Sequence, residues 1–292
     1  MNCAIVLGAT SMLGQEVVGQ LVEHGIEVIK AGRDPASDIV VNLGSGRPPV
    51  FRMPHKAQYL FHCASAFGGN SYDGRFENLR VNINGCAETL QIVHQADVRK
   101  IIYAGSIFSN PSLTSDPMGG YGFSKAETEQ ILTWGTHAAG GDFCSLRFAQ
   151  LWDTEGLCCN HQPWFGRIVA YASRGKLLRM PASNDPRNFM HVSDAARLMI
   201  SAANSELQGI YPACHPEDVD LYKLAKAACK TFDCGGDVVI DPKKTPLRKV
   251  EFPKDSSLYE RLGVHPKIAL PQGLELIHQA GTAFQFGPLD VQ

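Results

Sequence analysis

A tyrosine and a lysine stand four residues apart, at Tyr121 and Lys125. Four residues make about one turn of an α-helix, so both side chains lie on one face of a helix there. A neighbouring ammonium stabilises a phenolate, and Lys125 is predicted to lower the pKa of Tyr121 from about 10 toward neutrality. Such a phenol exchanges a proton with a substrate oxygen while hydride moves to or from a nicotinamide ring. Lys125 is also expected to reach the ribose that carries the ring.

The same spacing occurs at Tyr222 and Lys226, so chain context must decide between the two pairs. Tyr121 begins a predicted crossover helix after a strand at 101–104, at the sheet edge where ligands bind. Tyr222 lies far downstream on an amphipathic helix. It is interpreted as a packed tyrosine beside a surface lysine.

Ser106 lies just past the carboxyl end of the predicted strand at 101–104. Its hydroxyl can form a hydrogen bond with the same substrate oxygen with which Tyr121 exchanges a proton. A lone serine at such a place would only end a strand. Because Tyr121 follows in the same strand-to-helix crossover, a catalytic role is favoured, and the predicted catalytic residues are Ser106, Tyr121 and Lys125.

A glycine loop separates the first predicted strand, Cys3–Leu7, from a predicted helix at Leu13–His24. Gly8 allows a tight turn, and Gly14 lets the helix pack close to the strand. The helix N-terminus then offers free N–H groups and a positive dipole to a pyrophosphate. This placement favours a phosphate loop over an ordinary strand-to-helix turn. The expected dinucleotide contacts here are Gly8, Thr10, Ser11, Met12, Leu13 and Gly14.

The end of the second predicted strand indicates which dinucleotide is bound. An acidic residue there would hydrogen-bond the ribose 2′-hydroxyl of NAD. Arg33 stands at about that place, and a guanidinium suits the 2′-phosphate of NADP. The sequence therefore favours NADP over NAD. The alternative is that Arg33 is a solvated charge paired with Asp34.

Strand-like and helix-like segments alternate through the first half of the chain, which implies a parallel sheet with helices on both faces. After Arg147 the alternation of strand-like and helix-like segments ends, and proline and glycine recur toward the end of the chain. We predict a Rossmann-type, doubly wound α/β domain over 1–150, completed by part of 188–205. Residues 151–292 are predicted to form a smaller α/β substrate lobe. The segments interpreted as strands are 3–7, 26–31, 39–43, 59–63, 101–104 and 143–147, and those interpreted as helices are 13–24, 81–95, 125–134, 165–174, 193–203 and 220–232.

The composition is that of an ordinary globular protein, with 44% hydrophobic and 19% charged residues and a net charge of -2. This balance argues against a nucleic-acid or acidic-lipid partner. No stretch approaches the length of a membrane span, and the apolar run at 3–7 is too short for a signal peptide. The 9 cysteines include no C-x-x-C pair, so we expect reduced thiols, no metal site and a cytoplasmic location.

Together these residues resemble the extended short-chain dehydrogenase/reductase family, in its nucleotide-sugar epimerase, dehydratase and reductase branch. The resemblance covers nearly the whole chain. The glycine loop matches the family's G-x-x-G-x-x-G pattern, except that Ser11 replaces the middle glycine. The three predicted catalytic residues match the family's catalytic triad.

The resemblance implies further site residues. Asn82 resembles the family's structural helix asparagine, and Gln150 stands where an asparagine usually lies near the sugar. Arg187 resembles an arginine that contacts the nucleotide diphosphate, whereas without the family it would be a loop arginine near Asp185. The implied additional cofactor contacts are Asn42, Leu43, Cys63, Ala64 and Ser65, and the implied substrate contacts are Ser106, Gln150, Arg187 and Arg248.

The residues after Ser106 are Ile107 and Phe108, whereas dehydratases of this branch carry an Asp-Glu pair there. Dehydration is therefore not expected. Epimerases of the branch usually hold NAD, and Arg33 favours exchangeable NADPH. The resemblance thus implies NADPH-dependent reduction of a keto group on a nucleotide-linked deoxy sugar.

Three alternatives remain open. They are an NAD-dependent nucleotide-sugar epimerase, a non-catalytic dinucleotide-sensing protein, and a reductase of non-sugar carbonyl compounds. Sensing relatives usually lose the tyrosine–lysine pair that this chain keeps. Relatives commonly pair through the helices predicted here at Val81–Gln95 and Lys125–Trp134, so a homodimer is expected.

Overall fold

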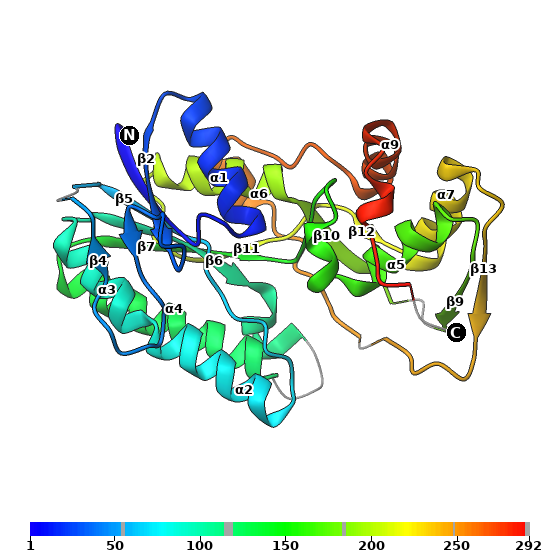
Figure 1. The fold of residues 1–292 in the computed structure, drawn as a ribbon, viewed down its shortest axis with the longest axis horizontal. Coiled ribbons are helices and arrows are strands. Elements are labelled where there is room, and N and C mark those ends of the chain that lie inside the picture. The colour runs from blue at the N-terminus through cyan, green and yellow to red at the C-terminus, as the bar shows by residue number, and fades with distance from the viewer. Residues whose placement is uncertain (54–55, 114–118, 183–184, 248, 290–292) are drawn as a thin grey trace.

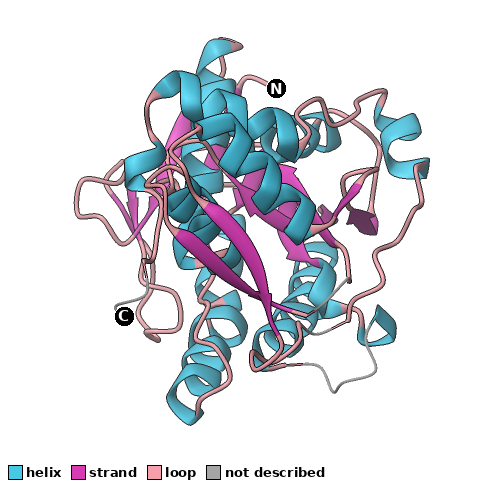
Figure 2. Cartoon of the chain, turned by 90° about the vertical axis from the view of Figure 1, so that its right-hand side faces the viewer, coloured by secondary structure: helices cyan, strands magenta, loops and turns pink. Residues whose placement is uncertain are grey.

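The structure is a computed structural model that describes residues 1–53, 56–113, 119–182, 185–247 and 249–289. Figure 1 shows a large sheet with helices on both faces, and beside it a smaller group of strands and helices. In the view of Figure 2 the helices again lie on both sides of the strands. The predicted fold class, a doubly wound α/β fold with a mostly parallel sheet, is confirmed.

The described residues form an eight-stranded sheet in the order β11-β7-β6-β5-β1-β2-β3-β4. All neighbours are parallel except β3 and β4. The chain moves outward from β1 in both directions, and ligands bind at the carboxyl ends of the strands next to such a reversal. The strands are β1 (Cys3–Leu7), β2 (Glu27–Gly32), β3 (Ile39–Val40), β4 (Val50–Phe51), β5 (Tyr59–His62), β6 (Lys100–Ser106), β7 (Asp142–Phe148) and β11 (Gly209–Ala213).

Both faces of this sheet are buried, which explains the continuous apolar runs of its strands. Ala4 and Val6 of β1 face a core that includes α1 (Met12–Glu23) and α6 (Val192–Ala203), whereas Ile5 and Leu7 face the opposite core. That opposite face is covered by α3 (Cys86–Gln95) and α4 (Gly120–Ala138). A short helix, α2 (Tyr72–Asn78), and a π-helix, η1 (Leu79–Asn84), lead into α3.

A separate core lies in the smaller group of elements, around the fully buried Trp152 and Phe165. Its strands form one three-stranded sheet, β12-β10-β8, and one pair, β13-β9. The elements here are β8 (Gln150–Trp152), β9 (Leu177–Pro181), β10 (Arg187–His191), β12 (Asp218–Val219), β13 (Asp237–Asp241), η4 (Leu157–Asn160), α5 (Pro163–Ala172), α7 (Leu221–Phe232), α9 (Leu270–Ala280) and η5 (Ala283–Gln285). The helix α8 (Ser257–Leu262) packs instead against α6 and β11 in the core of the large sheet, and η2 (Ile107–Ser109) and η3 (Pro111–Leu113) follow β6.

Several parts of the chain differ from the predicted elements, and none of the strands β4 and β8 to β13 was predicted. The helix predicted at 81–95 begins earlier, because a polar segment without clear periodicity forms α2 and η1 before it. The end of the chain contains α9, which carries Pro271 in its first turn, where proline is tolerated. The strand β11 joins the large sheet after α6, so residues beyond 150 take part in both cores. The domain boundary at 150 stays a prediction.

Within the described ranges, no helix is long and apolar enough to cross a membrane. All 9 cysteines are free. The residues described here include no group of three or more His, Cys, Asp or Glu side chains that could hold a metal ion.

Replacing Gly273 with alanine tests the packing of the second core. The added Cβ would lie 1.9 Å from Cη2 of Trp152, and overpacking of this kind costs roughly 1–3 kcal/mol. We expect urea unfolding to show a lower free energy of unfolding for Gly273→Ala. The control is Gly19→Ala in α1, where the added Cβ meets no atom within 4 Å and better helix propensity adds up to about 1 kcal/mol. Equal stability of the two variants would contradict the contact.

Candidate active site

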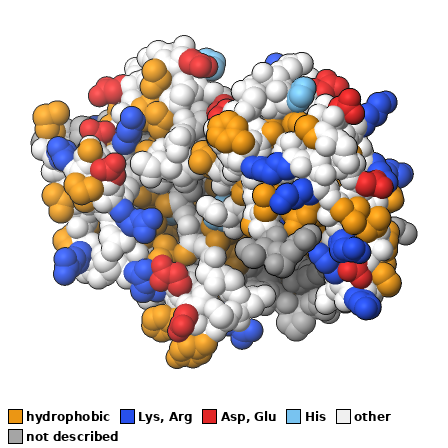
Figure 3. All heavy atoms as spheres, turned by 45° about the vertical axis from the view of Figure 1, so that its right-hand side comes forward, with side chains coloured by type: hydrophobic (Ala, Val, Ile, Leu, Met, Phe, Trp, Pro, Cys, Tyr) orange, Lys and Arg blue, Asp and Glu red, His pale blue; other side chains and the backbone are white. Residues whose placement is uncertain are grey.

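Three cavities lie together near the carboxyl edge of the large sheet, where the surface in Figure 3 is hollowed between its left and right halves. The glycine-loop cavity, about 960 Å³, lies beside the loop after β1 and the ends of β2 and β5. The tyrosine cavity, about 290 Å³, contains Ser106, Tyr121 and Lys125. The Arg187 cavity, about 340 Å³, is also lined by Tyr121, with Gln150 and Arg187. Ser11, Ser65 and Phe67 line both of the first two cavities.

The glycine loop leaves no room for a side chain at either of its two ends. Gly8 has φ +84°, and a Cβ there would lie 2.6 Å from the backbone nitrogen of Ala64. A Cβ on Gly14 would lie 2.0 Å from the Gly8 carbonyl oxygen. Ser11 caps α1, because its hydroxyl accepts a hydrogen bond from the Gly14 N–H at 3.0 Å. This capping role accounts for serine at the middle position of the motif.

Most of the predicted cofactor residues line these cavities. Arg33 directly follows β2 and lies on the glycine-loop cavity beside Asp34. The open cradle at the N-terminus of α1 suits a pyrophosphate, so the residues present fit a nicotinamide dinucleotide. The predicted residues on the glycine-loop cavity are Gly8, Thr10, Ser11, Arg33, Asn42, Leu43, Ala64 and Ser65, while Met12, Leu13 and Cys63 line the tyrosine cavity.

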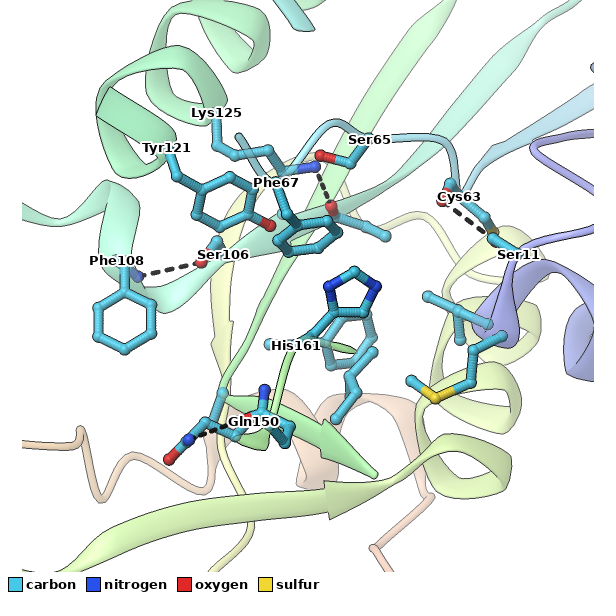
Figure 4. A pocket seen from close by; sticks show the side chains of 18 residues that line it. Ser11, Cys63, Ser65, Phe67, Ser106, Phe108, Tyr121, Lys125, Gln150 and His161 are labelled. Carbon is cyan, nitrogen blue, oxygen red and sulfur yellow. Dashed lines mark hydrogen bonds between the residues drawn. The ribbon is translucent and has the colours of Figure 1, made fainter. Parts of the chain in front are cut away.

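Tyr121 lies in the first turn of α4, and Ser106 ends β6, so helix and strand bring the two hydroxyls together (Figure 4). Burial raises the pKa of the Tyr121 phenol well above its usual value, and hydrogen bonds with Ser65 and Ser106 partly offset this rise. The phenol is therefore protonated at neutral pH. A protonated phenol is the form that a general acid requires.

Lys125 lies one turn further along α4 and is only 2% exposed. Its Nζ donates a hydrogen bond to the Ala104 carbonyl at 2.7 Å and lies 4.0 Å from the centre of the Tyr103 ring. Burial lowers the pKa of Lys125 to about 7, although the Glu129 carboxylate opposes the shift. The groups that shift the pKa of Tyr121 do not include Lys125. The prediction that this ammonium makes the phenol acidic is therefore wrong for this structure, because burial dominates.

Asn82 connects the loop after β5 to the helix α4. Its Oδ1 accepts a hydrogen bond from the Ala66 N–H at 2.8 Å, and its Nδ2 donates to the Ser124 hydroxyl at 2.9 Å. The Thr128 hydroxyl donates to the Asn82 carbonyl at 2.8 Å. These bonds hold Ser65 and Tyr121 at their places, which agrees with the structural role predicted for this asparagine.

A buried ion pair holds the other side of α4. Glu129 accepts hydrogen bonds from the Ser145 hydroxyl at 2.6 Å and from the Arg147 guanidinium at 2.5 Å. Gly105 leaves room for this cluster, because a Cβ there would lie 2.4 Å from the Ser145 hydroxyl. The cluster joins α4 to β7 and sets the position of Lys125 one turn away.

The predicted substrate residues Gln150 and Arg187 line the Arg187 cavity together with Tyr121. Gln150 donates a hydrogen bond from Nε2 to Oε1 of Gln162 at 2.5 Å, and its own Oε1 is buried with no partner among the described residues. Arg187 is 9% exposed and donates to the Pro186 carbonyl at 3.0 Å. Arg248 lies outside the described residues.

Sequence reasoning missed two aromatic residues that line the tyrosine cavity, Phe67 and His161. The Phe67 ring stacks on Tyr121, with centroids 4.6 Å apart, and on His161, with centroids 4.1 Å apart. Neither residue lies in a recognisable motif, so only the tertiary contact reveals them. The glycine-loop cavity also includes Glu77 and Arg80, which come from the helical segment whose start was not predicted.

The second tyrosine–lysine pair lies away from these cavities, on α7. Lys226 pairs with Asp237 at 2.6 Å, and its side chain is 44% exposed. Tyr222 packs against the second core. Both residues therefore have the structural roles that the sequence suggested.

Comparison with known proteins decides the family. The model of the NAD dependent epimerase/dehydratase family matches residues 4–212. The chain belongs to this family. The predicted membership of the extended short-chain dehydrogenases/reductases is confirmed, and so is the prediction of an NAD(P)-dependent enzyme.

Several known proteins are similar to the chain over nearly its whole length. A putative UDP-glucose 4-epimerase of Methanocaldococcus jannaschii is 20% identical over 94% of this chain and 96% of its own. The structure of UDP-N-acetylglucosamine 4-epimerase from Bacillus cereus has a TM-score of 0.75 at 21% identity, covering 100% of this chain and 99% of that one. The structure of RMD from Pseudomonas aeruginosa complexed with NADPH has a TM-score of 0.74 at 15% identity, covering 97% and 99%.

Lys125→Met tests the electrostatics of the site. Because burial lowers the pKa of Lys125 to about 7 from 10.5, the unfolded chain binds more protons than the folded chain between these values. The buried amine therefore destabilises the fold most at and below pH 7, and this loss disappears as the pH approaches 10.5. We expect Lys125→Met to melt several degrees above wild type at neutral pH, with a gap that narrows in alkali.

Thermal unfolding at several pH values measures that gap. The exposed Lys30→Met on β2 is the control, and its melting temperature should track wild type across the range. A difference for Lys125→Met that stays constant with pH would show that the charge of Lys125 carries no such cost.

Proposed function

We propose that this enzyme is an NADPH-dependent ketoreductase that acts on a keto group of a nucleotide-linked deoxy sugar. One observation carries the proposal. A protonated Tyr121, hydrogen-bonded to Ser106, stands in a cavity that adjoins the glycine-loop cavity, and Arg33 rather than an acid directly follows β2 there.

The glycine loop and Arg33 would hold the dinucleotide. The N–H groups at the start of α1 suit its pyrophosphate, and the Arg33 guanidinium suits a 2′-phosphate. When bound, NADPH supplies hydride to the carbonyl carbon of the substrate. The NADPH bound by RMD from Pseudomonas aeruginosa supports this choice on a similar fold.

Tyr121 donates the proton that completes the reduction. The Ser106 oxygen accepts a hydrogen bond from the Phe108 N–H at 3.3 Å. Its own O–H is hydrogen-bonded to Tyr121 and would turn to the substrate carbonyl oxygen when substrate binds. Hydride reaches the carbon, the phenolic proton reaches the oxygen, and the ketone becomes an alcohol. The phenolate left on Tyr121 is stabilised by the Ser65 and Ser106 hydroxyls.

The Arg187 cavity provides for the rest of the substrate. A guanidinium can bind a diphosphate through two parallel hydrogen bonds, and Arg187 lines this cavity together with Tyr121. The unpartnered Oε1 of Gln150 is available to accept a hydrogen bond from a sugar hydroxyl. The predicted contact Arg248 completes the proposed substrate set.

A second candidate is an NAD-dependent nucleotide-sugar epimerase. Asp34 lines the same cavity as Arg33, and a carboxylate there could bind the 2′-hydroxyl of NAD. The similar Bacillus cereus structure is an epimerase. Analysis of the purified protein separates the two: tightly held NAD indicates an epimerase, and freely exchanging NADPH indicates the reductase.

The intact Tyr121 and Lys125 disfavour a non-catalytic sensor, and binding of nucleoside diphosphates would disfavour a reductase of non-sugar carbonyls.

The proposal includes a homodimer that works in the cytoplasm. Large apolar side chains are exposed on α2, η1 and α4, and such exposed groups commonly mark an interface. A second copy placed on these helices would cover them. Free thiols are typical of a reducing compartment. The exposed side chains are Tyr72, Phe76, Leu79, Phe123 and Trp134.

Tyr121→Phe tests the role of the phenol. Removing the acidic proton leaves the ring and its packing in place, so we expect turnover to fall by about 10²- to 10⁴-fold with little change in NADPH affinity. Steady-state kinetics and NADPH fluorescence titration measure the two effects. A variant that kept substantial reductase activity would remove Tyr121 from the role.

Arg33→Ala tests the choice of dinucleotide. A hydrogen bond to a charged group contributes roughly 1.5–3 kcal/mol, so affinity for NADPH should fall about tenfold or more while affinity for NADH stays within about twofold. The control is Arg99→Ala, which removes an exposed arginine paired with Asp97. Equal losses for the two dinucleotides would disprove recognition of the 2′-phosphate.

A further inference from the structure

Three rings are stacked across the tyrosine cavity, in the order Tyr121, Phe67, His161 (Figure 4). The Phe67 ring is inclined by 23° to Tyr121 and by 32° to His161. Phe67 belongs to the loop after β5 of the large sheet, whereas His161 directly follows η4, beside the second core. The stack therefore bridges the two halves of the molecule.

Phe67 is held in place although its side chain is 50% exposed. On one side, the Asn82 side chain bonds to both the N–H and the carbonyl of Ala66. On the other side, Oδ1 of the buried Asn78 accepts a hydrogen bond from the Gly68 N–H at 2.8 Å. Two asparagines one helical turn apart thus fix the backbone on both sides of an exposed aromatic ring. The exposed ring is thereby held on the wall of both the glycine-loop cavity and the tyrosine cavity.

His161 is presented by an equally well-anchored segment. The buried Asp153 accepts hydrogen bonds from the N–H groups of Leu157 and Cys158, at 3.0 and 2.9 Å. These bonds hold η4, and the His161 N–H continues it by donating to the Cys158 carbonyl at 2.9 Å. Both partners of the Phe67–His161 contact are therefore set by buried polar groups rather than by each other.

The stack also stands at the junction of two cavities. Phe67 lines both the glycine-loop cavity and the tyrosine cavity, and His161 lines the latter. A dinucleotide whose phosphates lie on the glycine loop and whose nicotinamide reaches Tyr121 must pass this junction. We propose that Phe67 and His161 form an aromatic latch, which must part each time the dinucleotide enters or leaves the cleft.

The latch has a kinetic signature. An aromatic pair contributes roughly 0.5–1.5 kcal/mol beyond its buried area, so its loss should change a rate by about two- to tenfold. Because the rings must part for entry and for release, both rates should rise. The dissociation constant should therefore change less than either rate.

Stopped-flow fluorescence tests this directly with NADPH as the probe. The variants are Phe67→Ala, His161→Ala and the double variant, with Phe67→Leu as a milder change. We expect each single variant to speed both binding and release by about two- to tenfold, and the double variant to be no faster than the faster single one. His161→Phe keeps a ring and should restore slow exchange. The control is Phe284→Ala, an exposed aromatic on η5.

Unchanged exchange rates in both single variants would overturn the latch, and so would a double variant whose effect is the product of the single effects. The proposal rests on a dinucleotide in the cleft but not on its identity. If NADH exchanges through the latch and NADPH does not bind, the latch stands and the NADPH-dependent function falls. If neither dinucleotide binds the wild-type protein, both fail.

Discussion

The side chain of Asn82 is the interaction on which the rest of the site depends. It is buried within the π-helix η1 and bonds both to the loop after β5 and to the helix α4. Through these bonds it sets Ser65 and Phe67 on one side and Tyr121 on the other. A π-helical turn, which often occurs at functional sites, places this asparagine between the two elements. Beside it, the loop and the helix also meet through the Ser65–Tyr121 hydrogen bond and the stack of Phe67 on Tyr121.

The electrostatics of the site follow from burial. Tyr121 remains a neutral acid because burial raises its pKa, while Lys125 is brought near neutrality because burial lowers its pKa. The Glu129 carboxylate, which is paired with Arg147, opposes this shift in the pKa of Lys125. Folding therefore tolerates a poorly solvated amine beside the phenol, and stability is traded for a reactive site.

The sequence was informative wherever a residue type is tied to one local conformation. Gly8, Gly14 and the spacing of Tyr121 and Lys125 identified the loop and the catalytic helix, because backbone sterics and the helical repeat act over a few residues. Periodicity located most of the sheet and its covering helices. It failed for α2 and η1, whose apolar residues follow no clear repeat, and for α9, whose proline and glycine resembled loop signals.

By itself the sequence determined the fold class, and it pointed to the glycine loop and to the proposed catalytic residues Ser106, Tyr121 and Lys125, since these depend on short-range patterns. Only the tertiary structure decided the ionisation of Tyr121 and Lys125, because desolvation depends on everything packed around a group. Only the fold, likewise, could bring Phe67 and His161 face to face. They are far apart in the chain and share no motif. Their contact exists because buried polar side chains, the asparagines beside Phe67 and the aspartate before His161, hold the two loops against the same cleft.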